Sequence, residues 1–180
     1  MSSSFGTVRT FLDRLYTTGG VLAALFLIAI LVLILVQMLA RWTGEVFPGA
    51  PDYAGYSMAA ASFFAFAHAL NRGAHIRVSI LLNALGKGAR RVVEIWCFLI
   101  GTGLAWYFVW FAVKTTYWSY TFNDISQGQD ATPIWIPQLG MVLGSILFAI
   151  ALLDHLVHLV LFGEHRIEVE KVRDASEGHV

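Results

Sequence analysis

The feature that most constrains this chain is an apolar run at residues 21–39, in which Gln37 is the one strongly polar side chain. About 20 apolar residues in a helix can cross a hydrocarbon core about 30 Å thick. Lipid offers the backbone no hydrogen-bond partners, and the run lacks the polar–apolar alternation of a barrel strand, so the segment must be helical. It is longer than a signal-peptide core and has no small-residue cleavage site after it, so we expect a retained membrane span.

Three further apolar segments predict spans at residues 54–70, 92–113 and 134–162. The composition agrees, because 57% of the residues are hydrophobic and 13% are charged, against about 25% charged in soluble domains. The second segment is short and rich in small residues, which indicates either close helix packing or the composition bias of a marginal span. The last is long enough to require tilt or protrusion. We therefore predict an all-α integral membrane protein with one four-helix membrane domain at residues 1–165.

The basic residues predict the orientation, because Lys and Arg collect in cytoplasmic loops. They precede the first span, lie between the second and third, and follow the fourth, whereas only Arg41 and Lys114 lie on the opposite side. Both termini and the middle loop are therefore expected in the cytoplasm. Aromatic residues near the span ends predict interface anchors. These are Trp42, Trp110, Trp118 and Trp135.

The middle loop carries an amphipathic pattern of its own, with Val78, Leu81, Leu82 and Leu85 spaced as on one helical face. We predict a helix at residues 75–88 that lies in the membrane interface and contacts lipid phosphates or another subunit. The residues expected to make these contacts are Arg72, His75, Arg77, Lys87, Arg90 and Arg91. The tail at residues 166–180 mixes charges and is predicted to be disordered.

Few ionisable residues fall inside the predicted spans, where they would be expensive and therefore functional. Glu94 and Asp154 lie near the cytoplasmic ends, where solvation or salt bridging is expected. No series of buried acids crosses the membrane, which argues against an ion path in this chain. His68 could face His155 or His158 and hold a haem, but ordinary interfacial histidines are the favoured interpretation. We predict no cofactor, metal site or catalytic residue, and the net charge of zero suggests no nucleic-acid partner.

The loop between the third and fourth spans is polar with aromatic flanks. Its polar residues lack the spacing of a calcium-binding loop. It is either a solvated connector or a surface that docks a partner by polar contacts. The residues proposed for docking are Asp124, Gln127, Gln129 and Asp130.

Three short motifs resemble a known family. They are Leu-Ala-Arg-Trp at residues 39–42, Asn-Arg-Gly-Ala-His-Ile-Arg-Val at residues 71–78 and Trp-Ile-Pro at residues 135–137. With the four-span layout, the chain resembles the DctQ-type small membrane subunit of tripartite ATP-independent periplasmic (TRAP) transporters over about residues 12–162. Family members often have an acidic pair entering the second span and an aspartate after the valine. Here Asp52 precedes Tyr53, and Ser79 follows Val78, so ion pairs of relatives cannot be transferred.

The resemblance implies an inner-membrane complex of bacteria or archaea that imports organic acids or similar solutes with a sodium gradient. In that family a large membrane subunit holds solute and ions, and a periplasmic binding protein delivers the solute. The small subunit would be a scaffold, not an enzyme, with the large subunit, the binding protein and phospholipids as partners. The alternative is a haem-bearing membrane anchor of a redox enzyme.

Overall fold

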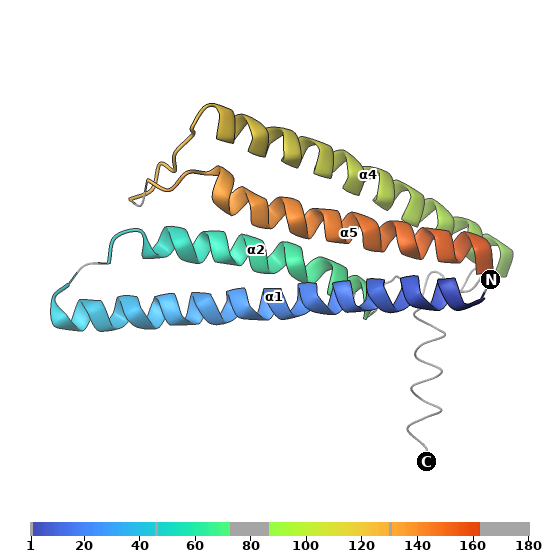
Figure 1. The fold of residues 1–180 in the computed structure, drawn as a ribbon, viewed down its shortest axis with the longest axis horizontal. Coiled ribbons are helices and arrows are strands. Elements are labelled where there is room, and N and C mark those ends of the chain that lie inside the picture. The colour runs from blue at the N-terminus through green and yellow to red at the C-terminus, as the bar shows by residue number, and fades with distance from the viewer. Residues whose placement is uncertain (1, 46, 73–86, 130, 163–180) are drawn as a thin grey trace, which may run out of the picture.

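The computed structural model describes residues 2–45, 47–72, 87–129 and 131–162, and this part of the chain is helical apart from its loops and one isolated bridge. Its helices are α1 (Ser2–Thr43), α2 (Ala50–Asn71), α4 (Lys87–Thr121) and α5 (Trp135–Phe162) (Figure 1). The predicted interfacial helix at residues 75–88 lies outside the described residues except for its end, where Lys87 and Gly88 belong to α4. The tail at residues 166–180 also lies outside them.

The helices form a flat layer in the order α1, α2, α5, α4 (Figure 1). Helix α1 packs along α2, α2 along α5, and α5 along α4, while α1 and α5 share a smaller contact. Much of the surface of these helices is therefore uncovered by the described neighbours. Large apolar side chains are exposed there, including Leu31, Trp96 and Leu104. A soluble protein rarely leaves so much contiguous apolar surface exposed, and lipid or another membrane subunit must cover it.

Three of these helices, at Thr10–Thr43, Gly88–Thr121 and Trp135–Leu161, are long and apolar enough to cross a membrane. Helix α2 is not among them, because residues such as Tyr53, Tyr56, Ser62 and His68 lower its mean hydropathy. The prediction of an all-helical protein is thus confirmed within the described residues, and three of its helices could span a membrane by their length and composition. The fourth span at residues 54–70 stays a prediction.

Two of the helices extend well beyond the predicted spans, because apolar composition marks only the part that lies in lipid. Helix α1 has 42 residues, which at about 1.5 Å per residue gives a length of about 63 Å. It ends at Gly44, whose φ of 80° allows the amides of Gly44 and Glu45 to donate to the carbonyls of Arg41 and Ala40. Helix α4 continues to Thr121 and ends in the same way at Asn123, with φ 53°.

The small residues of α2 do pack closely, as one of the two interpretations of this segment predicted. Ala60, Ala61 and Ala67 are buried between the neighbouring helices. A Cβ built at Gly144 of α5 would lie only 2.6 Å from the carbonyl carbon of Phe63. A Cβ at Gly19 of α1 would lie 3.1 Å from the carbonyl oxygen of Phe64. Small residues thus bring α2 into backbone contact with helices on both sides.

Candidate functional site

The loop between α4 and α5 folds into a short hairpin at residues 123–134, which we call the external hairpin. Ile125 and Pro133 form an isolated antiparallel bridge. The amide of Ser126 donates to the carbonyl of Thr132 at 2.8 Å, and the amide of Ile134 donates to that of Asp124 at 3.0 Å. The loop therefore has internal backbone order and a defined surface.

Side chains of α2 hold this hairpin in place. The Tyr56 hydroxyl donates to Ser126 Oγ at 2.6 Å, and the backbone amide of Gln129 donates to the Asp52 carboxylate at 3.2 Å. Gly128 lies so close to the same carboxylate that a Cβ there would collide with it. Asp52 is in the first turn of α2, where the helix dipole favours a negative charge. These contacts make the external hairpin and the start of α2 one connected surface.

The external hairpin presents three of the four residues that the sequence suggested for docking. Asp124, Gln127 and Gln129 are exposed on it, and Asp130 lies outside the described residues. Ile125 and the neighbouring Phe122 are exposed as well, so polar and apolar groups alternate on this surface. The sequence did not indicate that Asp52 and Tyr56 support it.

At the opposite end of the layer the structure describes three of the predicted basic contact residues in detail. Arg90 pairs with Glu94 at 3.1 Å, which confirms the salt-bridged role expected for Glu94. Arg91 Nη2 donates to the carbonyl of Val160 at 3.3 Å, near the end of α5. Arg72 is exposed at the end of α2. Lys87 begins α4, whereas His75 and Arg77 lie outside the described residues.

The histidines that suggested a haem pack at different helix interfaces. A Cβ at Gly20 of α1 would lie 2.8 Å from Cγ of His68, so that imidazole covers the α1 backbone. His155 stacks on Phe98 of α4 with ring centroids 6.0 Å apart. Among the described residues no group of three or more His, Cys, Asp and Glu side chains could hold a metal. The imidazoles of His68 and His155 thus pack against different helices, α1 and α4.

The predicted tryptophan anchors have different surroundings. Trp42, Trp110 and Trp118 project outward, with Trp42 81% exposed. Trp135 instead packs edge-on against Tyr120, with ring centroids 5.6 Å apart. It therefore contributes to the contact between α4 and α5 as well as lying at a helix end.

Charged side chains are absent from the middle of the described helices α1, α4 and α5. Along the sequence no Asp, Glu, Lys or Arg lies between Arg14 and Arg41, between Glu94 and Lys114, or from Trp135 to Leu153. An apolar hollow of about 500 Å³ opens between α2, α4 and α5. It is lined by Phe63, Phe66, Gly101, Leu104, Ala105, Phe108, Ser145, Phe148 and Leu152.

The lining of this hollow is unsuited to a carboxylate. The rings of Phe63 and Phe108 stack across it at 5.7 Å. The Ser145 hydroxyl donates to the carbonyl of Val142 at 2.9 Å within its own helix. A carboxylate needs charged or amide donors. The hollow is therefore suited to apolar contact only.

The comparisons with known proteins agree with the resemblance noted from the motifs. The family model for the DctQ component of tripartite ATP-independent periplasmic transporters matches residues 30–162. This range includes α2, α4, α5, the external hairpin and the last turns of α1. A search of curated proteins gives no match.

Proposed function

We propose that this chain, which belongs to the DctQ family of TRAP transporter components, is a static scaffold for the large membrane subunit of its transporter. The observation that carries this proposal is the layer one helix thick. Apolar side chains fill the contacts between the described helices, so a solute path would have to be completed by other chains. The uncharged helix centres and the apolar hollow agree with this, because neither offers a ligand to an organic acid or to sodium.

Length and apolar surface support the mechanical part of the role. Helices α1 and α4, with 42 and 35 residues, form the two edges of the layer. At about 1.5 Å per residue both are longer than the roughly 30 Å hydrocarbon core, so they can tilt and anchor at both surfaces. A broad layer fixed in this way would enlarge the static part of the complex while the large subunit moves solute. Import of organic acids with a sodium gradient is the family expectation that we adopt.

We propose that α2 is the fourth span and that both termini are cytoplasmic. Helix α2 lies between α1 and α5 along its length, and both of these are long and apolar enough to span a membrane. Its close contacts with Gly19 of α1 and Gly144 of α5 support this proposal, because they put the middle of α2 between two candidate spans. Lipid-facing apolar residues on both neighbours would leave α2 within the hydrocarbon region. The distribution of the basic residues supports an orientation with the external hairpin in the periplasm, and the inner membrane is the family expectation that we adopt.

Cysteine labelling tests this topology. With the exposed Cys97 changed to Ser, single cysteines at Glu45, Gln127 and Arg72 can be probed in intact cells with a membrane-impermeant maleimide. All three positions are exposed in the structure. We expect Glu45→Cys and Gln127→Cys to react at once and Arg72→Cys to react only after the inner membrane is opened. Labelling of Arg72→Cys in intact cells would refute the four-span arrangement.

We further propose that the external hairpin contacts the periplasmic solute-binding protein. The support is its exposed mixture of polar and apolar groups and its attachment to α2 through Asp52 and Tyr56. A surface that is already ordered loses less conformational freedom on binding than a flexible loop does.

At the opposite end of the helices we propose that Arg72 contacts lipid phosphates or the large subunit, because Arg90 and Arg91 already bind within the chain.

A further inference from the structure

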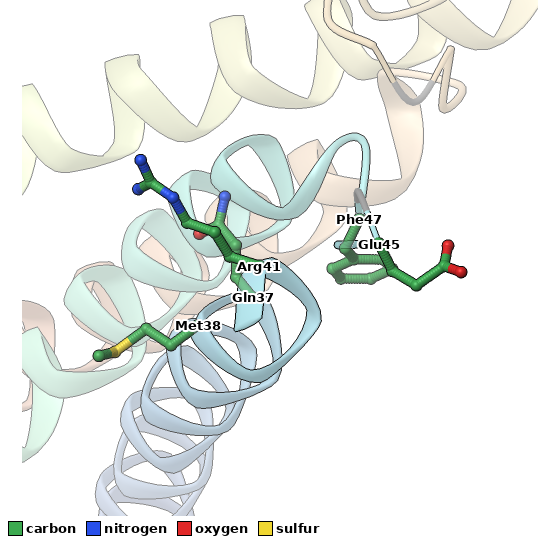
Figure 2. A pocket seen from close by; sticks show the side chains of 5 residues that line it. All are labelled: Gln37, Met38, Arg41, Glu45 and Phe47. Atoms are coloured by element: carbon green, nitrogen blue, oxygen red, sulfur yellow. The ribbon is translucent and has the colours of Figure 1, made fainter. Parts of the chain in front are cut away.

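The last turns of α1 carry a polar hollow at the end of an otherwise apolar helix. The hollow has a volume of about 400 Å³ and is lined by Gln37, Met38, Arg41, Glu45 and Phe47 (Figure 2). None of these residues takes part in the external hairpin or in the basic end of the layer.

Helix α1 leaves its neighbours near this hollow. Figure 1 shows that its end extends beyond the start of α2. Large apolar side chains are exposed along α1 from Val21 to Leu39, with Leu27 at 59% and Leu39 at 58%, so the apolar surface continues up to the hollow. Several sides of these turns are not covered by any described residue. If α1 spans a membrane, lipid acyl chains or another subunit must cover them.

The polar groups of the hollow are arranged to bind an anion. Gln37 and Arg41 are four residues apart, which places them on one side of the helix. Figure 2 shows these two side chains together, while the Glu45 carboxylate points away from them. Arg41 is exposed, and its side chain makes neither an ion pair nor a hydrogen bond with any residue that the structure describes. An arginine guanidinium matches a phosphate well, because it can donate two parallel hydrogen bonds.

We propose that Arg41 and Gln37 bind the phosphate of a phospholipid whose acyl chains lie along the exposed turns of α1. The apolar turns directly below the hollow favour a lipid over a free anion, because one molecule would satisfy both surfaces. Trp42, 81% exposed in the same turn, is the residue type that lies at the level of lipid headgroups. The lipid would also compensate a basic residue on the side of the membrane where the chain has few. This inference depends on α1 spanning the membrane and not on the scaffold role.

Native mass spectrometry of the full chain, expressed with its membrane partners and purified in mild detergent, tests the proposal. The probes are dioleoylphosphatidylglycerol and dioleoylglycerol, which share acyl chains but differ in the phosphate. We expect the wild-type protein to retain the phospholipid in preference to the diacylglycerol. Arg41→Ala should bind the phospholipid about tenfold more weakly, because it loses a charge-assisted hydrogen bond. The phospholipid affinity of Arg41→Lys should fall between those of the wild type and Arg41→Ala.

Lys114→Ala is the matched control, since Lys114 is the other exposed basic residue on the same side and does not line the hollow. It should bind phospholipid as the wild type does. Equal retention of diacylglycerol, or unchanged phospholipid binding in Arg41→Ala, would overturn the proposal by showing apolar binding alone. Displacement by inorganic phosphate would assign the hollow to a free anion. Loss of a protein subunit from Arg41→Ala with unchanged lipid would assign Arg41 to that partner.

Discussion

Replacing Gly144 with alanine is expected to lower the free energy of unfolding by about 2 kcal/mol or more, the upper range for overpacked sites. The new Cβ would lie 2.6 Å from the carbonyl carbon of Phe63 and 2.8 Å from the amide nitrogen of Phe64. Both are backbone atoms, so no side-chain rotation relieves the collision. Helix α5 must move away from α2, which weakens the packing between these two helices. Thermal or SDS-induced unfolding in detergent measures the change.

Gly103→Ala is the control for this substitution. Gly103 is also inside a long apolar helix, but a Cβ there meets no heavy atom within 4 Å. Alanine has the higher helix propensity, so this variant should be as stable as the wild type or slightly more stable. If both variants lose the same stability, the loss does not come from a collision with α2, and the close packing of α2 and α5 has no special importance.

Weakening the attachment of the external hairpin to α2 is expected to raise the binding-protein concentration needed for half-maximal uptake about tenfold. The double variant Asp52→Ala, Tyr56→Phe removes the hydrogen bonds to Gln129 and Ser126. A hairpin that must be ordered on each encounter binds more weakly, and about 1.4 kcal/mol corresponds to a factor of ten. Uptake measured against binding-protein concentration should show a raised half-saturation concentration and a nearly unchanged maximum, because the membrane layer is intact.

Ser62→Ala is the control in this experiment, because among the described residues the Ser62 hydroxyl bonds only to the carbonyl of Met58 in its own helix. It should leave the uptake curve unchanged. A lowered maximum with an unchanged half-saturation concentration in the double variant would place the defect in the membrane complex. An unchanged curve would show that the hairpin does not contact the binding protein.

The sequence predicted the helical class and the apolar cores of the helices, because lipid imposes helix on any long apolar run. It predicted spans and gave no helix ends. Helix α4 runs to Thr121, beyond the span predicted at residues 92–113, and the hydroxyls of Thr116 and Thr121 bond to carbonyls of the preceding turn. Hydropathy contains no information about where a helix ends outside the membrane.

The neighbours of each helix could not be predicted from one sequence. The layer order depends on contacts such as Gly144 with Phe63 and Gly20 with His68, which join distant parts of the chain. Asp52 was noted only as a departure from the family pattern, yet it accepts a hydrogen bond from Gln129, 77 residues away. The docking residues were chosen by exposure and polarity, and the structure adds the support that holds them. The side-chain contacts of Arg90 with Glu94 were the easier part, because i and i+4 share a helical face.

The scaffold role is tested most directly by purifying the tagged chain from its native membrane in mild detergent and identifying what accompanies it by mass spectrometry. We predict that a much larger polytopic membrane subunit is recovered with the wild type and with Gly103→Ala, and in reduced amount with Gly144→Ala. Recovery of the chain alone from intact wild-type membranes, or with a redox enzyme in place of a transporter subunit, would contradict the scaffold role.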